Sequence, residues 1–175
     1  MQPKENGQKN LKIYNSKKKF LYLISPNKID NQFFKDLKNI LKFNKTNFFQ
    51  LRLKNESLKK KMNIGKKIKK ICHLNKVKFL INDDPWLAKE INADGCHLGQ
   101  NDTKIAKARK ILGNKIIGIT CHNSLRLGKK AIVSGADYIA IGAFYRTKTK
   151  KVKFKAKFST IKKLKKLSNM PIVAI

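Results

Sequence analysis

The sequence predicts an α/β fold in which parallel strands alternate with helices, as in a TIM (β/α)8 barrel that stops after its seventh strand. Short apolar runs begin near residues 20, 47, 77, 94, 116, 137 and 171. Stretches with helical spacing of apolar residues separate them, and such an alternation favours a parallel sheet. An open doubly wound sheet is the alternative. Its dinucleotide-binding form lacks support, because no G-x-G-x-x-G turn follows the first run and no Walker A run is present.

A single domain is expected from the size of the chain. It has 175 residues, of which 41% are hydrophobic, and this is enough material for one core. Residues 1–19 are polar, contain the run Lys17-Lys18-Lys19, and are predicted to form an N-terminal tail. Residues 20–175 form the predicted barrel. We expect the barrel to be incomplete at its C-terminus, because nothing follows the strand-like run at residues 171–175.

The stretch from Phe79 to Asp102 contains two of these strands, and each one runs directly into acids and amides. Ligands bind at the carboxyl ends of parallel strands, so we expect these polar residues to share one rim. Two carboxylates and two amides there suit Mg²⁺, which takes one or two protein carboxylates together with substrate phosphates. In the alternative interpretation Asp83 or Asp84 caps the next helix and Asp102 caps the one after. The residues predicted for the rim are Asn82, Asp83, Gln100 and Asp102.

A second polar set lies in the strand predicted over residues 48–54. Side chains alternate along a strand, so Gln50, Arg52 and Lys54 would point to one face, which in a closed barrel can be the lumen and its mouth. A cationic stripe in such a strand is costly unless a ligand or an acid meets it. The set therefore predicts an anionic ligand; the alternative is that Asp83 or Asp102 neutralises an inward Arg52.

The remaining predicted elements add one hydroxyl, one imidazole and one basic loop. A helix over residues 58–74 would bury Leu58, Met62, Ile64, Ile68 and Ile71. The strand over residues 115–120 presents Thr120, and the turn after it contains His122, a position more typical of helix starts or packing than of catalysis. The loop over residues 143–150 interleaves hydroxyl and ammonium groups, which suit phosphate oxygens; a solvated basic loop is the alternative. Its candidate ligands are Thr147, Thr149 and Lys150.

The net charge of +32 raises the question of nucleic acid. Only 4 of the 42 basic residues are Arg, which leaves 42 − 4 = 38 Lys. Arg is the residue that reads bases through paired hydrogen bonds, so we interpret the Lys as compositional and expect no specific nucleic-acid binding. A phosphorylated substrate is still favoured by this charge. We expect no membrane span, because no apolar run reaches 18 residues.

Three cysteines, each followed by His, make an odd set without a disulfide framework. This usage predicts a reducing, cytoplasmic location. Zinc binding by the Cys-His pairs is disfavoured, because neighbouring strand residues point to opposite faces.

Several motifs in order resemble those of thiamine phosphate synthase. They cover about residues 20 to 175. The Thr147–Lys150 motif favours the synthase over its thiazole tautomerase sibling, which shares the barrel. The motifs are Gln50-Leu51-Arg52-Leu53-Lys54, Ile81-Asn82-Asp83, Ala93-Asp94-Gly95-Cys96-His97-Leu98-Gly99-Gln100-Asn101-Asp102, Gly135-Ala136-Asp137-Tyr138 and Thr147-Lys148-Thr149-Lys150.

The resemblance implies a transferase of thiamine biosynthesis that joins hydroxymethylpyrimidine diphosphate to thiazole phosphate and releases diphosphate. Both substrates are small molecules. By motif, Asp83 and Asp102 would hold Mg²⁺ and Gln50 would face the pyrimidine. Thr120 stands where the family has a serine near the diphosphate. Thr147 and Thr149 would meet the thiazole phosphate. The diphosphate would be bound, and its departure assisted, by Arg52, Lys54, Asn82 and Lys150.

The chain departs from the family's pattern at a few positions. Leu53 replaces an acid, Tyr145-Arg146 replaces a Pro-rich turn, and Thr120 replaces the serine. The family continues after the last strand into a Gly-Gly turn, an eighth strand and a helix, so we expect the thiazole phosphate pocket to be incomplete here. Two alternatives therefore stay open: a truncated non-catalytic, regulatory or tautomerase-like relative that binds a thiamine precursor, and a Lys-driven binder of RNA or another polyanion.

Overall fold

A computed structural model describes residues 19–43, 45–145 and 155–175 of the chain. Thr147, Thr149 and Lys150 lie outside these residues. The described residues divide into two compact units, Lys19–His97 and Leu98–Ile175, which we call the N-terminal and the C-terminal unit.

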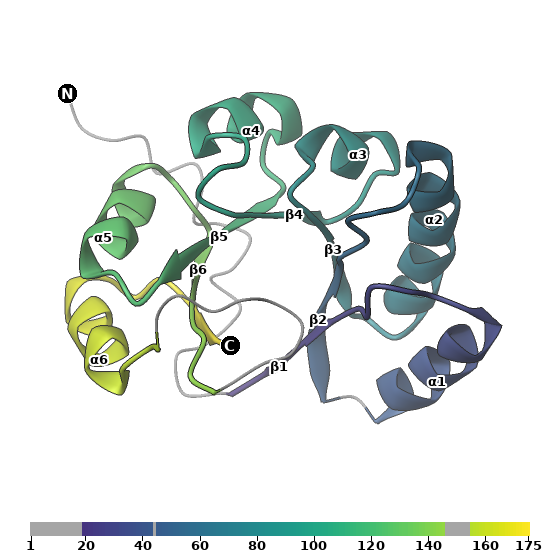
Figure 1. Cartoon of the computed structure of the whole chain (residues 1–175), viewed down its shortest axis with the longest axis horizontal. Helices are drawn as coiled ribbons and strands as arrows, with labels where there is room; N and C mark the ends of the chain where they lie inside the picture. The colour runs from purple at the N-terminus through teal and green to yellow at the C-terminus, as the bar shows by residue number, and fades with distance from the viewer. Residues whose placement is uncertain (1–18, 44, 146–154) are drawn as a thin grey trace. The chain divides into compact units, whose positions relative to one another are not determined.

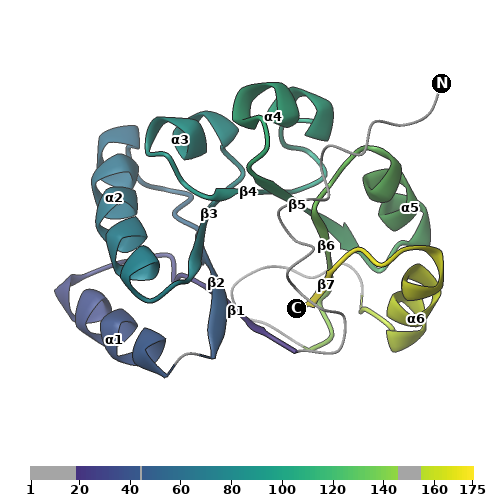
Figure 2. The same cartoon turned by 180° about the vertical axis from the view of Figure 1, so that it is seen from behind.

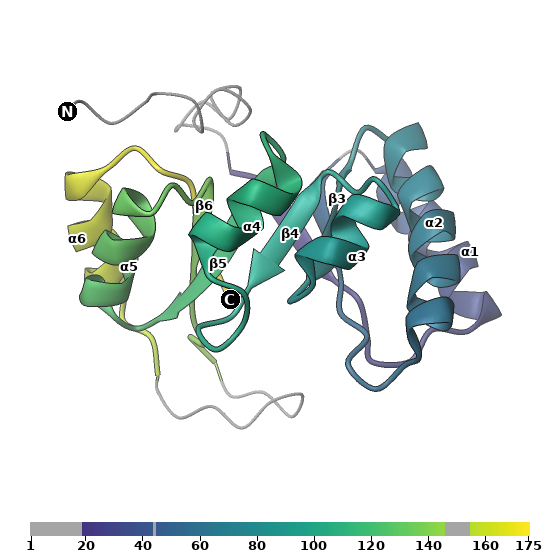
Figure 3. The same ribbon diagram turned by 90° about the horizontal axis from the view of Figure 1, so that it is seen from above.

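The N-terminal unit consists of parallel strands that alternate with helices (Figure 1). Each of its strands pairs with the next one along the chain, with Ile24 opposite Gln50, Gln50 opposite Leu80, and Asn82 opposite His97. Helices α1 and α2 lie side by side in both Figure 1 and Figure 3. The elements are β1 (Leu21–Ile24), α1 (Asn31–Lys42), β2 (Thr46–Leu51), α2 (Leu58–Leu74), β3 (Lys78–Asn82), α3 (Pro85–Glu90) and β4 (Gly95–Leu98), whose first three residues belong to this unit.

The core of the N-terminal unit forms where β2 and β3 meet α2. Phe79 and Leu80 in β3 are fully buried, as is Ile68 in α2. The prediction for α2 is confirmed in its bounds and in the burial of Ile64, Ile68 and Ile71. It is wrong for Leu58, whose side chain is 60% exposed. Leu58 is exposed because it is the first residue of α2, directly after the N-cap Ser57, and the buried residues of this helix begin only at Ile64.

The C-terminal unit repeats the same plan, with β5 paired to β6 and β6 to β7, all parallel (Figure 2). Gly113 ends α4 with a φ of 58° and Gly135 follows α5 with a φ of 80°, conformations that glycine adopts without strain. Helices α5 and α6 lie side by side (Figures 1 and 2). The elements are α4 (Ile105–Leu112), β5 (Ile116–His122), α5 (Leu125–Val133), β6 (Tyr138–Ile141), α6 (Phe158–Leu167) and β7 (Ile172–Ala174).

Two predicted strand boundaries are wrong. Strand β2 ends at Leu51 and does not continue to Lys54, so Arg52 and Lys54 belong to the loop that follows it. Strand β5 continues past Thr120 to His122. All other predicted strands and helices lie close to their expected positions. Among the described residues, no helix is both long and apolar enough to span a membrane.

Candidate substrate site

A chain of hydrogen bonds links three strands of the N-terminal unit and reaches the carboxyl ends of β2 and β3. The Tyr22 hydroxyl donates to Gln50 Oε1 at 2.7 Å, and Gln50 Nε2 donates to Asn82 Oδ1. Gln50 is almost fully buried, so these bonds fix the orientation of its amide. Because the Asn82 oxygen is an acceptor in this chain, its Nδ2 hydrogens form the donor end, which suits an anionic ligand.

Tyr22 is a member of this group that the sequence analysis missed. It sits in β1, and its ring stacks on Phe48 with the ring centroids 5.8 Å apart. A single hydroxyl in an otherwise apolar strand is the signal that could have identified it, because a buried tyrosine hydroxyl generally finds a polar partner.

Asp83 follows β3 directly and pairs with a lysine. Its carboxylate lies 3.6 Å from Lys54 Nζ, and both side chains keep access to solvent, at 31% and 53% exposure. The backbone of Asp83 is left-handed, with a φ of 65°, and its N–H donates to the His97 carbonyl at 2.7 Å. Asp84, not Asp83, caps the next helix, because its Oδ1 accepts from Leu87 N. The capping alternative is therefore wrong for Asp83.

Arg52 is held by partners from the loop after β1. Its backbone N–H donates to Ser25 Oγ at 2.9 Å, and its guanidinium donates to Asn27 Oδ1 at 3.0 Å. The expected strand-like alternation of Gln50, Arg52 and Lys54 does not hold, because the strand ends before Arg52. The acid that pairs with a base at this end of the unit is Asp83, and its partner is Lys54.

In the C-terminal unit Asp102 closes the loop that follows β4. Its Oδ2 accepts from Gly99 N at 2.6 Å. A Cβ at position 99 would lie 2.7 Å from that same oxygen, so a larger residue there would displace the Asp102 carboxylate. The alternative role for Asp102 is wrong, since α4 begins after Lys104 without a side-chain cap. Gln100 Nε2 donates to the Thr120 carbonyl, and this bond ties the loop to β5.

The turn after β5 holds a second residue that the sequence analysis did not single out. Asn123 Oδ1 accepts from Lys157 N at 3.0 Å and from Thr160 Oγ1 at 2.7 Å. Helix α6 has no side-chain cap of its own, so Asn123 supplies that acceptor from the end of β5. His122 beside it ends the strand with a φ of 51°, and its carbonyl accepts from Gly142 N.

Two other motif aspartates lie at the amino ends of strands. Burial acts to raise the pKa of Asp94, but hydrogen bonds from Phe79 N, His73 and Lys78 outweigh it and hold that pKa below its usual range. For Asp137 burial dominates and raises the pKa, although Arg109 Nη2 and Ile117 N both lie 2.7 Å from its Oδ2. These contacts identify both aspartates as structural.

The cysteines offer no activated nucleophile. All three are buried, and none of them forms a disulfide. Burial raises the pKa of the thiols of Cys72 and Cys121 to about 12, so both are neutral at physiological pH.

The structure therefore groups the predicted site residues by unit. Gln50, Lys54, Asn82 and Asp83 come together in the N-terminal unit, and a second group, Gln100, Asp102 and Thr120, comes together in the C-terminal unit. Within the described ranges no group of three or more His, Cys, Asp or Glu side chains could hold a metal ion. Mg²⁺ needs fewer protein ligands, and carboxylate oxygens such as those of Asp83 are of the type it prefers.

Parallel strands that alternate with helices and have carboxylates, amides and an ammonium group at their carboxyl ends are typical of (β/α)-barrel enzymes, which bind their ligands at those ends. Thiamine phosphate pyrophosphorylase from Pyrococcus furiosus superposes with a TM-score of 0.78 at 26% identity, over 89% of this chain and 74% of that one. A truncated 3-deoxy-D-arabino-heptulosonate 7-phosphate synthase from Thermotoga maritima, at 17% identity and a TM-score of 0.61, shares the fold alone. The predicted fold class is confirmed.

The sequence comparisons identify the family. A profile of thiamine monophosphate synthase matches residues 21–175. The thiamine-phosphate synthase of Pelagibacter ubique is 65% identical over 90% of this chain and 77% of its own length. That of Nitrosococcus oceani is 42% identical over 72% of this chain and 58% of its own length. The chain belongs to the thiamine monophosphate synthase family, as its motifs predicted.

Proposed function

We propose that this protein joins hydroxymethylpyrimidine diphosphate to thiazole phosphate, giving thiamine phosphate and diphosphate. The observation that carries the proposal is the directed chain Tyr22–Gln50–Asn82 beside the Lys54–Asp83 pair. The donors Asn82 Nδ2 and Lys54 Nζ suit a diphosphate. The Asp83 carboxylate suits the metal ion that accompanies a diphosphate. Membership of a family of thiamine-phosphate synthases supports the same assignment.

The proposed roles extend the sequence predictions. Gln50 can donate the second hydrogen of its Nε2 to a ring nitrogen of the pyrimidine. The second lone pair on its Oε1 can accept from the amine of the pyrimidine. Asn82, Arg52 and Lys54 bind the diphosphate, together with Lys150. Thr120 stands near the diphosphate, and Thr147 and Thr149 bind the thiazole phosphate. Asp83 and Asp102 would each supply a carboxylate to Mg²⁺.

The chemistry needs charge stabilisation more than it needs a nucleophile. As the bond between the pyrimidine methylene and the diphosphate oxygen breaks, negative charge grows on the leaving group and the aminopyrimidine carries the positive charge. The thiazole nitrogen then attacks the methylene carbon. Arg52, Lys54 and Asn82 stabilise the departing diphosphate by ionic and hydrogen-bond contacts. Bound Mg²⁺ supplies further charge neutralisation to the diphosphate.

The test is direct. The protein is mixed with both substrates and Mg²⁺, and thiamine phosphate is measured by chromatography. We expect product only with both substrates, its loss in EDTA, and its recovery on adding Mg²⁺. If calorimetry shows that both substrates bind but no product forms, the protein is a non-catalytic relative and the proposal fails. We further propose a cytoplasmic location, which three cysteines without a disulfide suit.

A further inference from the structure

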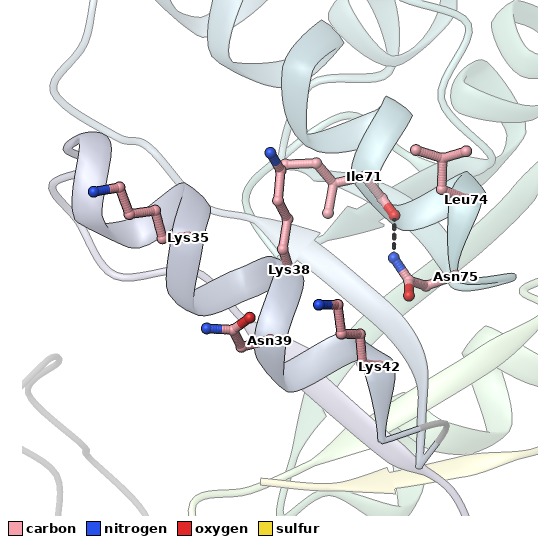
Figure 4. Close-up of a pocket in the computed structure, with 7 residues that line it drawn as sticks. All are labelled: Lys35, Lys38, Asn39, Lys42, Ile71, Leu74 and Asn75. Carbon is pink, nitrogen blue, oxygen red and sulfur yellow. Dashed lines mark hydrogen bonds between the residues drawn. The ribbon is translucent and has the colours of Figure 1, made fainter.

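Helices α1 and α2 of the N-terminal unit enclose a groove of about 450 Å³ (Figure 4). Helix α1 lines it with Lys35, Lys38, Asn39 and Lys42, and the C-terminal end of α2 adds an apolar part. Ile71 there is buried, whereas Leu74 is 76% exposed. No acidic side chain is among the lining residues that the structure describes. We call this feature the α1–α2 groove.

The α1–α2 groove is separate from the candidate substrate site. Lys42 and Leu74 are the last residues of their helices, and each helix ends shortly before the next strand begins, at Thr46 and Lys78. The groove therefore lies toward the amino ends of the strands. Gln50, Asn82 and Asp83 lie toward the carboxyl ends, so the proposed reaction does not use the groove.

The ammonium groups of the groove lysines are available to pair with an acidic ligand. The side chains of Lys35, Lys38 and Lys42 form no ion pair or hydrogen bond in the part of the chain that the structure describes. Asn75, next to Leu74, is already engaged, because its Nδ2 donates to the Ile71 carbonyl at 2.8 Å (Figure 4). The ammonium groups are therefore the main polar contacts that an occupant could make.

A compact phosphate is a poor occupant. Compact anion sites use backbone N–H groups at helix N-termini, whereas this groove includes the C-terminal ends of two helices, which carry partial negative charge. Its donors all belong to side chains. The geometry instead favours an extended acidic partner that reaches the ammonium groups with side chains of its own.

The spacing of the lysines narrows the choice of partner. Lys35, Lys38 and Lys42 stand at positions i, i+3 and i+7 of α1, so they share one face and span about 10 Å at 1.5 Å per residue. Acidic residues with this spacing on another helix match them one to one. An apolar side chain borders the lysines, since Leu74 at the end of α2 lines the same groove and is 76% exposed. A nucleic-acid backbone has no apolar side chains to cover it, and a second copy of this chain carries the same charge of +32.

We propose that the α1–α2 groove is a docking site for an acidic amphipathic helix of another protein. Its Glu or Asp side chains pair with the lysines of α1, and its apolar side chains cover Leu74. This is the helix-in-groove mode of recognition, here with an acidic face added.

The experiment uses a defined probe, a labelled helical peptide of about 18 residues with Glu at i, i+3 and i+7 and Leu at i+4 and i+8. Binding is measured by fluorescence anisotropy at physiological ionic strength, where diffuse surface attraction is screened. A peptide of the same composition with consecutive glutamates is the control probe. We expect it to bind at least about tenfold more weakly, because its charges do not match the pitch of α1.

Protein variants locate the site. Lys35→Gln, Lys38→Gln and Lys42→Gln together should weaken binding at least about tenfold. Lys162→Gln, Lys163→Gln and Lys166→Gln, on exposed positions of α6, remove the same charge and should weaken it less than about threefold. Leu74→Ser, which leaves the charge unchanged, should weaken it about threefold. Both triple variants should keep thiamine phosphate synthesis, which shows that they fold.

Three results would overturn the proposal. Equal losses in the two triple variants would mean diffuse charge attraction, and equal binding of the two peptides would mean that helical spacing is irrelevant. If a single-stranded oligonucleotide or an anionic lipid vesicle binds more tightly than the peptide and loses that binding in the groove variant, the groove serves phosphate polymers or membranes instead of an acidic helix.

Discussion

The aspartates at the amino ends of the strands and those at the carboxyl ends have opposite surroundings. Asp94 and Asp137 each accept a backbone N–H from the preceding strand, from Phe79 and Ile117, and return their own N–H to the carbonyl of that same residue. Asp83 and Asp102 stand in loops after strands. One pair therefore joins strand to strand, while the other is placed where ligands bind.

One sequence motif can therefore contain both a structural aspartate and an aspartate of the candidate site. Asp94 and Asp102 belong to one continuous motif, yet Asp94 pairs with His73 at 2.7 Å and Lys78 at 3.2 Å. Within the described residues Asp102 contacts only its own loop, through Gly99 N. The same repeated βα unit produces a structural acid before each of two strands. Mutations should therefore separate an effect on stability from an effect on activity.

The largest effect should come from Asp137→Ala. Asp137 is only 3% exposed at its side chain, and its removal leaves Arg109 and the Ile117 N–H without this acceptor. Breaking a buried pair in this way costs about 3 kcal/mol or more. Chemical denaturation measures the loss in free energy of unfolding. Asp137→Asn is the control, since it keeps an acceptor, and an equal loss in both variants would assign the effect to charge alone.

At the carboxyl ends, Asp83→Asn and Asp102→Asn should each slow thiamine phosphate synthesis at least about a hundredfold, or about 2.7 kcal/mol in activation free energy. Asparagine suits both places, because it tolerates the left-handed backbone of residue 83 and keeps an acceptor for Gly99 N. The free energy of unfolding should change by less than about 1 kcal/mol. A variant with full activity at saturating Mg²⁺ would remove that residue from the metal assignment.

Most of the fold could be predicted from the sequence, because apolar periodicity and glycines mark the strands and helices. The bounds of α2 were predicted in this way. The side-chain network could not be predicted. Which of Asp83 and Asp84 caps α3 depends on backbone angles, and the link between Tyr22 and Gln50 joins residues 28 positions apart through the register of β1 on β2. Neither is a local property of the sequence.

A smaller loss is expected for Asp94→Ala, about 1–2 kcal/mol of unfolding free energy, chiefly from the Phe79 N–H that loses its acceptor. His73 and Lys78 are about half exposed, so water replaces their contacts with the carboxylate. His73→Gln, which keeps a side-chain donor, should cost less than about 0.5 kcal/mol. If His73→Gln proves as costly as Asp94→Ala, the ion pair and not the strand contact carries the stability.

The smallest expected effect is a difference between Asp94 and Asp137 in how each changes the pH dependence of the free energy of unfolding. The folded pKa of Asp94 is lowered, so its stabilisation is complete above the unfolded value of about 3.9 and is lost as pH falls through the folded pKa. The folded pKa of Asp137 is raised by burial, so its carboxylate forms at a cost and stability is lost as pH rises through that pKa. Denaturation of the wild type, Asp94→Asn and Asp137→Asn across acidic pH should therefore show differences from the wild type that change in opposite directions. If both differences grew with pH, Arg109 would outweigh the burial of Asp137, and the two amino-end aspartates would be electrostatically alike.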